Sequence, residues 1–256
     1  MFFKGAQRAM IQRQYSPVTD DYWELDLNQY WDDQFLDPAL APVMLVPGYG
    51  MNAFVLGFHP SDVSMIEYFV AQGFEVWTAN LRGQGHSRPT RKRAGRKGLG
   101  ELALQDVPAS LRAIRSYTRT QCQQVHGIGC SLGASILFGY LAHTADHALA
   151  SMISLGGPLR WDEVHPLVRV AFASPRLVGA LPIRGARIGA RLAVPAIRRL
   201  PSLGAIYLNA SEIDLDAAGQ LVQTVENPSR RLNRQIARWV RSGDLLLEGL
   251  NVTEAL

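Results

Sequence analysis

The chain has 256 residues, of which 47% are hydrophobic and 19% charged, with a formal net charge of +4. This length allows one large domain or two small ones, and the composition is that of a soluble protein with a substantial core. Two cysteines exclude a disulfide framework, and the absence of an uncharged apolar run of 18 residues argues against a membrane span. Because the N-terminus also lacks the apolar core of a signal peptide, we expect a cytoplasmic protein.

Strands and helices are expected to alternate along the first 157 residues. Short apolar runs that end in glycine predict the strands, and apolar residues spaced three and four apart predict the helices. The expected strands span 22–27, 42–47, 74–79, 124–129 and 150–155, and the expected helices span 66–73, 106–117 and 132–143. Such alternation predicts an α/β fold with a mostly parallel sheet and helices on both faces.

The amino-acid composition of the sequence changes after Pro158. Six prolines fall between positions 158 and 201, among arginines and small apolar residues. A clear helix follows at 229–241, with Asn227 as its expected cap, Pro228 as its first residue and Gly243 as its end. We therefore expect a hydrolase-like core over 1–157, a helical lid over 158–243 and a return toward the core over 244–256.

Ser131 lies in the pattern Gly-x-Ser-x-Gly, between an expected strand and an expected helix. This pattern is typical of a strained turn that exposes a serine nucleophile, and it needs small residues two before and two after the serine. Gly129 and Gly133 meet that need for Ser131, whereas Cys130 has Ile128 and Leu132 at those positions. The backbone N–H of Leu132, at the start of the next helix, would help to hold an oxyanion.

A second loop, Pro47–Gly50, ends an earlier strand and contains Gly48. In a hydrolase sheet such a loop supplies the other oxyanion donor, here the backbone N–H of Tyr49. A plain turn at the end of a strand would have a similar sequence.

The chain resembles the α/β-hydrolase family over roughly residues 40–160. The resemblance rests on the order and spacing of Pro42–Gly50, Asn80–Ser87 and Gly129–Gly133. Leu56–Ser61 further resembles a branch that contains lipases and polyhydroxyalkanoate synthase-like proteins. Those synthases usually carry cysteine at the elbow, so Ser131 favours esterase or lipase chemistry. The resemblance implies a nucleophilic acyl transfer on carboxylic esters, with no cofactor and no metal.

The resemblance also implies an acid and a histidine base beyond the lid, and neither is visible in the sequence. It therefore implies a chain without the last strands of the fold, weak or absent turnover, and an open sheet edge prone to pairing with another chain. His165, at the start of the lid, is the candidate substitute base, close in sequence to Asp162 and Glu163. His143 and His147 lie at the far end of the helix that Ser131 begins, too far away for a hydrogen bond.

The positive charge is concentrated in two segments. Seven Lys and Arg and no acid lie between Arg82 and Lys97, and eight Arg with two acids lie between Pro158 and Pro201. The basic loop (residues 88–97) is either a solvated loop or a contact for anionic lipid or an acyl-donor phosphate. The lid sequence suits either a lipid surface or ordinary packing. Nucleic-acid binding is not expected, because no recognisable motif accompanies the charge.

Three functions remain open from the sequence. The first is a serine esterase or lipase that acts on a small-molecule or lipid ester. The second is an acyltransferase or polyhydroxyalkanoate synthase-like protein. The third is a non-catalytic protein that keeps the fold and binds lipid or a partner, in the cytoplasm or at the periphery of a membrane.

Overall fold

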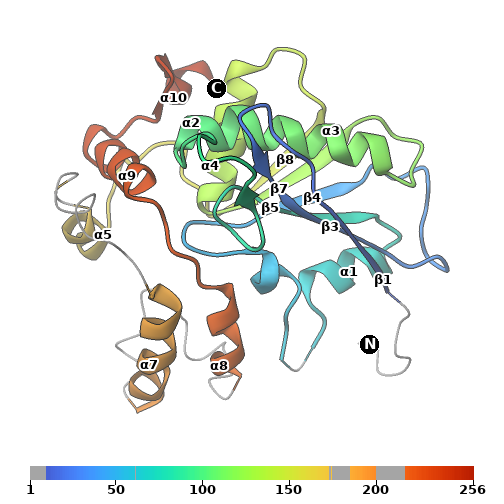
Figure 1. Ribbon diagram of the computed structural model, residues 1–256, viewed down its shortest axis with the longest axis horizontal. Coiled ribbons are helices and arrows are strands. Elements are labelled where there is room, and N and C mark those ends of the chain that lie inside the picture. Colours follow the sequence, from blue (N-terminus) through green and yellow to red (C-terminus); the bar gives the residue numbers. More distant parts are fainter. Residues whose placement is uncertain (1–9, 61, 173, 175–184, 200–216) are drawn as a thin grey trace.

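A six-stranded sheet forms the centre of the protein (Figure 1), in the strand order β1-β3-β5-β4-β7-β8. The computed structural model describes residues 10–60, 62–172, 174, 185–199 and 217–256. The strands of this sheet are β1 (Ile11–Tyr15), β3 (Asp26–Trp31), β4 (Val43–Val46), β5 (Val76–Asn80), β7 (Val125–Cys130) and β8 (Leu149–Leu155). The last four of these are mutually parallel, whereas β1 and β3 run antiparallel to their neighbours. The expected mostly parallel sheet is confirmed.

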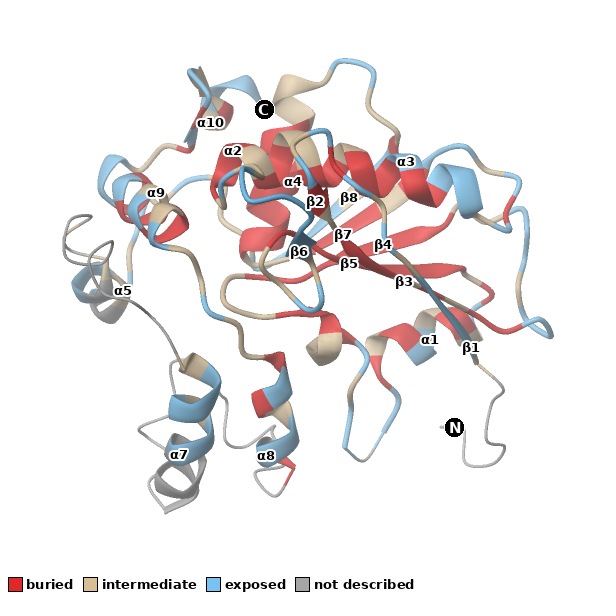
Figure 2. Cartoon of the chain, in the orientation of Figure 1, coloured by how far each residue is buried: buried red, intermediate tan, exposed pale blue. Residues whose placement is uncertain are grey.

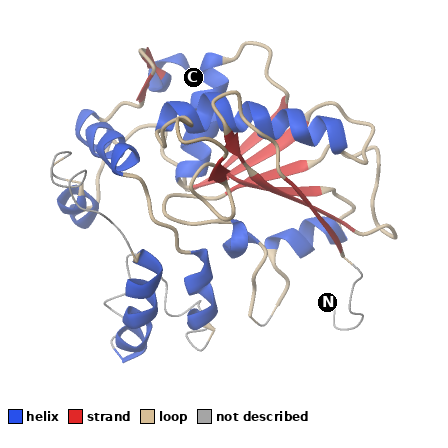
Figure 3. Cartoon of the chain, in the orientation of Figure 1, coloured by secondary structure: helices blue, strands red, loops and turns tan. Residues whose placement is uncertain are grey.

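Helices cover both faces of the sheet (Figure 3). The helical segments are η1 (Ala53–Leu56), α1 (Met65–Ala71), α2 (Leu99–Glu101), η2 (Leu102–Asp106), α3 (Val107–Tyr117), α4 (Leu132–His143), α5 (Pro166–Ala171), α7 (Ala186–Arg199), α8 (Ala218–Leu221), η4 (Val222–Thr224), α9 (Arg230–Ser242) and α10 (Val252–Ala255). Two short antiparallel pairs complete the described elements: β2 (Trp23–Glu24) with β6 (Arg88–Pro89), and β9 (Leu246–Leu247) with β10 (Leu250–Asn251). No described helix has the length and apolar character needed to cross a bilayer.

The two faces of the sheet have separate apolar cores (Figure 2). On one face, α3 and α4 pack over the sheet and apolar residues of α9 join the same cluster, in which Trp77 and Leu137 are fully buried. On the other face, α1 and η1 cover a smaller cluster that includes Leu45 and Ile66. Every residue of β4 and β5 is buried, as expected for inner parallel strands covered by helices on both sides.

β8 differs from the inner strands because it lies at the margin of the described sheet. It pairs with β7 on one side, and its side chains are mostly exposed beyond Leu149. Ile153 and Leu155 are 48% and 39% exposed, although both are apolar. The strand carries no charged residue that would discourage pairing with another strand.

The helix α9 belongs to the main core through its apolar face. Leu232, Ile236 and Trp239 on that face belong to the same apolar cluster as residues of α3 and α4. The expected end at Gly243 is confirmed, since this residue is the C-cap with a φ of 84°. The expected cap Asn227 and first residue Pro228 are wrong. Ser229 caps the helix, because its hydroxyl accepts a hydrogen bond from Leu232 N, while Asn227 Oδ1 accepts one from Ala186 N. The boundaries drawn for core, lid and return remain predictions.

Candidate active site

Ser131 occupies a sharp turn between β7 and α4. Its backbone has φ 51° and ψ −121°, a conformation that residues with a side chain seldom adopt. The turn is held from outside, since Ser131 N donates a hydrogen bond of 2.9 Å to Leu155 O at the end of β8. The side chain is half-buried, and its hydroxyl makes no hydrogen bond to any residue that the structure describes. The hydroxyl is therefore available to a molecule from outside.

The glycines around Ser131 are required by close backbone packing. A Cβ at Gly129 would collide with the backbone of Ala134, and one at Gly133 would collide with the carbonyl oxygen of Val46. Both contacts arise because α4 starts directly against the ends of β7 and β4. Burial raises the pKa of the neighbouring Cys130 thiol, so this residue stays protonated and is a poor competing nucleophile.

We expect Ser131→Gly to raise the free energy of unfolding by about 1 kcal/mol. Relief of the strained backbone contributes about 1–3 kcal/mol, and the greater freedom of glycine in the unfolded chain offsets part of that gain. Urea unfolding of this variant beside Ser131→Ala measures the effect, because alanine removes the hydroxyl and retains the strain. A glycine variant no more stable than the alanine variant would contradict a strained turn.

Two backbone segments surround the place where an oxyanion would form. Leu132 is the first residue of α4, and its N–H has no acceptor among the described residues, as is usual for the first N–H groups of a helix. The loop that contains Gly48 lies against the turn, since a Cβ built on Gly48 would lie 2.9 Å from Cys130 O and 3.1 Å from the Ser131 Cβ. Tyr49 follows directly, so the structure brings together the three segments that the sequence singled out.

The loop of Tyr49 is anchored to α9, which the sequence analysis did not foresee. The phenol of Tyr49 donates a hydrogen bond of 2.7 Å to Asn233 Oδ1, and Asn233 is fully buried. The Tyr49 ring also meets Phe172 edge to face, with ring centroids 6.1 Å apart. A polar Asn233 on the apolar face of a helix was the signal in the sequence that such a partner existed.

The segment that precedes α9 runs along the same loop. Glu226 N donates to Gly50 O at 2.8 Å, and Asn52 N donates to Thr224 O at 2.9 Å. Between these two bonds, Met51 and Val225 form an antiparallel bridge. The loop of the candidate oxyanion hole is thus fixed on one side by the turn at Ser131 and on the other by residues 224–226.

A buried ion pair supports the loop after β5. The Arg82 guanidinium contacts Asp106 Oδ1 at 2.7 Å and Asp21 Oδ2 at 2.6 Å, and the side chains of Arg82 and Asp106 are both 0% exposed. Burial raises the pKa of Asp106 to about 6, although its bonds with Arg82 act in the opposite direction. For Asp21 burial is the largest single influence and raises the pKa, but the hydrogen bonds from Arg82 and Thr19 together with the charge of Arg82 outweigh it and hold the pKa below the usual value. A small cavity of about 30 Å³ beside this loop is lined by Gly48, Leu132 and Lys97, among others.

All six histidines of the chain lie in described residues, and none donates to or accepts from Ser131. His143 is bound at the end of α4 by Gly139 O and Leu247 O, at 2.8 and 3.1 Å. His126 pairs with Ser151 Oγ at 2.8 Å, between β7 and β8. His165 is exposed just before α5, and its role as base remains a prediction.

Comparison with known proteins agrees with this arrangement. The family model for the alpha/beta hydrolase fold matches residues 41–175, which is just over half of the chain. No curated protein sequence matches the chain.

Three solved structures share the fold at low sequence identity. A protein from Burkholderia cenocepacia that is provisionally classed as an aryl esterase is 18% identical, with a TM-score of 0.52 over 93% of this chain and 74% of that one. A provisional epoxide hydrolase from Pseudomonas aeruginosa is 13% identical, with a TM-score of 0.55 over 94% and 72%. A hypothetical protein from the same organism is 11% identical, with a TM-score of 0.54 over 90% and 72%. From the family match and the shared fold, we conclude that the chain belongs to the alpha/beta hydrolase family.

Proposed function

We propose that the chain carries out nucleophilic acyl transfer on carboxylic esters, with Ser131 as the nucleophile. The observation that carries this proposal is the strained turn, which presents a half-buried hydroxyl without a hydrogen-bond partner in the described part of the chain. In this proposal the N–H groups of Leu132 and Tyr49 face the carbonyl oxygen on which charge develops, which is supported by the close approach of the Gly48 loop to the Ser131 turn. Donors fixed in advance at that place stabilise a tetrahedral oxyanion.

In this mechanism the Ser131 Oγ attacks the ester carbon and forms a C–O bond. The carbonyl electron pair moves onto the oxygen, which the N–H groups of Leu132 and Tyr49 hold. Collapse of this intermediate breaks the bond to the leaving oxygen, which receives the proton taken from Ser131 and departs as the alcohol. Water then cleaves the acyl-serine, which releases the carboxylic acid and restores the serine. The hydroxyl proton needs an acceptor, and His165 is the candidate that the sequence offers.

A lipophilic ester fits the exposed side chains of the lid helices. Ile188 and Leu192 lie one turn apart on α7 and are 67% and 74% exposed, and Val170 on α5 is exposed as well. Apolar side chains in this position suit contact with an acyl chain or with the periphery of a lipid surface. We propose a cytoplasmic protein that works at the periphery of a lipid surface.

The test is covalent labelling with a fluorophosphonate, followed by intact mass spectrometry. We expect one adduct on the unmodified protein, no adduct on Ser131→Ala and an undiminished adduct on Cys130→Ala. Cys130 is the matched control because it is the adjacent residue and carries a nucleophilic group. Equal labelling of the unmodified protein and Ser131→Ala would reject Ser131 as the nucleophile.

A non-catalytic binding protein is the second candidate. The observation that favours it is the lack of a hydrogen bond between Ser131 and any of the six histidines. Liposome binding together with no fluorophosphonate adduct would establish this alternative in place of the first.

A further inference from the structure

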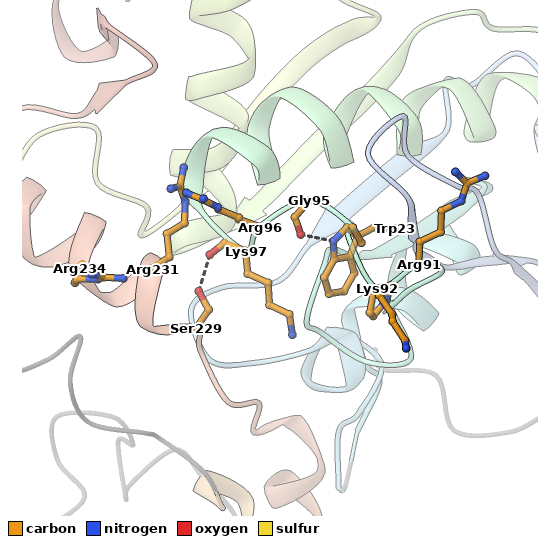
Figure 4. Close-up of a pocket in the computed structure, with 11 residues that line it drawn as sticks. Trp23, Arg91, Lys92, Gly95, Arg96, Lys97, Ser229, Arg231 and Arg234 are labelled. Carbon is orange, nitrogen blue, oxygen red and sulfur yellow. Dashed lines mark hydrogen bonds between the residues drawn. The ribbon is translucent and has the colours of Figure 1, made fainter.

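A basic cleft of about 550 Å³ lies between the basic loop and α9 (Figure 4). Its charged lining residues are Arg91, Lys92, Arg96, Lys97, Arg231 and Arg234. No acidic residue lines it. A second hollow next to it is lined by Arg96, Arg231 and Arg234 together with Arg238. The cleft is therefore a concentration of positive charge on one side of the described structure.

The fold builds this cleft from segments more than 130 residues apart. Ser229 Oγ donates a hydrogen bond to Lys97 O, and Leu99 N donates one of 2.9 Å to Gln235 Oε1. These two bonds join the end of the basic loop to the first turns of α9. Because the apolar face of α9 packs into the core, Arg234 and Arg238 are left exposed on its outer face.

The charges of the cleft are only partly compensated within the described chain, by Glu226 near Lys97 and by Glu101. Arg231 contacts Glu101 at 3.1 Å, but its Nε is buried and has no acceptor. Neither Arg96 nor Arg234 forms an ion pair with a described acidic residue. Like charges held together without counter-charges repel one another, so the arrangement favours an anion that several of them can share.

The cleft also lies next to the candidate active site. Lys97 and Ser229 line the basic cleft and also line the small cavity beside Gly48, Tyr49 and Leu132. The Lys97 ammonium lies 5.1 Å from the centroid of the Trp23 ring, on the wall of the cleft. A ligand bound among the arginines could therefore extend toward the turn that presents Ser131.

We propose that the basic cleft binds the phosphate-bearing end of the ester on which Ser131 acts. This inference rests on the proposed function, and it adds a substrate class to it. Guanidinium groups pair with phosphate oxygens through two parallel hydrogen bonds, and several arginines together suit a group with more than one negative charge. The same phosphate chemistry occurs in a soluble organic phosphate and in a phospholipid headgroup.

The first test measures binding of inorganic pyrophosphate by calorimetry, in the Ser131→Ala background so that no chemistry contributes. We expect the double substitution Arg96→Gln/Arg234→Gln to weaken binding about tenfold or more, since each lost charged contact removes a sizeable share of the affinity. The matched control is Arg13→Gln/Arg115→Gln, which removes the same charge from two exposed residues away from the cleft. This control is expected to bind as the parent does.

The second test separates the two sources of phosphate. Vesicles of phosphatidylglycerol are compared with vesicles of phosphatidylcholine by co-sedimentation, with the same pair of double variants. Binding of the anionic vesicles alone assigns the cleft to a lipid headgroup, whereas binding of pyrophosphate alone assigns it to a soluble phosphate. If neither ligand binds saturably, or if the cleft variant and the control weaken binding equally, the proposal is overturned.

The experiments distinguish rejection of the phosphate-binding cleft from rejection of Ser131 as the nucleophile. The fluorophosphonate adduct on Ser131 requires no phosphate site, and pyrophosphate binding requires no Ser131. An adduct without pyrophosphate or vesicle binding rejects the cleft alone. Binding without an adduct rejects Ser131 as the nucleophile and leaves the cleft as a phosphate-binding site without the proposed substrate role.

Discussion

Replacing Asp106 with asparagine is expected to lower the free energy of unfolding by about 3 kcal/mol or more. Asp106 receives hydrogen bonds from the N, Nε and Nη2 atoms of Arg82, at 2.8, 2.9 and 2.7 Å. Asparagine keeps the size of the side chain but removes the negative charge, so the buried guanidinium retains only the partly exposed Asp21 as a counter-charge. Loss of one member of a buried ion pair is costly because the other charge stays away from water.

Asp20→Asn serves as the matched control for this variant. Asp20 lies 3.7 Å from Arg112, and its side chain is 82% exposed. Solvent screens such a pair, so we expect a change within about 0.5 kcal/mol. Urea unfolding of both variants, with an unchanged slope against denaturant, measures the difference. Equal losses would mean that the pair between Arg82 and Asp106 contributes no more than a surface contact.

Imidazole added to the solution is expected to raise the rate of fluorophosphonate labelling at Ser131 about tenfold or more. A positioned general base contributes roughly 10²–10⁴-fold to such reactions, and none of the six histidines forms a hydrogen bond with Ser131. The half-buried serine is open to a small molecule, so a base from solution can take up part of this role. The rate constant is followed by mass spectrometry over a series of imidazole concentrations.

Two variants make this result specific. Ser131→Ala must show no adduct at any imidazole concentration, which excludes labelling elsewhere. His165→Ala tests the base that the sequence suggested: labelling that falls in this variant, and that imidazole restores, would assign the role to His165. The contrary result has two parts: the labelling rate does not respond to imidazole, and His165→Ala does not change that rate. Together they would contradict the idea that Ser131 lacks a base.

Local sequence patterns were sufficient for the elements that build the site. The short apolar runs at β4, β5 and β7 were recognisable because parallel strands covered on both faces are rich in apolar residues. The spacing of Gly129 and Gly133 around Ser131 follows from the close approach of strand and helix at the turn. In both cases the structure is determined by residues close together in the sequence, so a local pattern is enough to predict it.

Contacts between distant segments could not be predicted in the same way. The bond from Tyr49 to Asn233 joins residues 184 positions apart, and no local pattern specifies which partner a buried amide finds. The misplaced start of α9 has a similar cause, because Asn227 and Ser229 are both good capping residues. Contact of Asn227 with Ala186 decided between them, and that contact depends on the tertiary fold.

The hydrogen bond from Ser131 N to Leu155 O ties the candidate nucleophile to the outermost strand of the described sheet. Marginal strands open locally at a lower free energy than central ones, because fewer contacts hold them. Opening of the end of β8 would break this hydrogen bond and free the Ser131 amide. We therefore expect deuterium uptake by this single amide to report how often the margin of the sheet frays beside the candidate nucleophile.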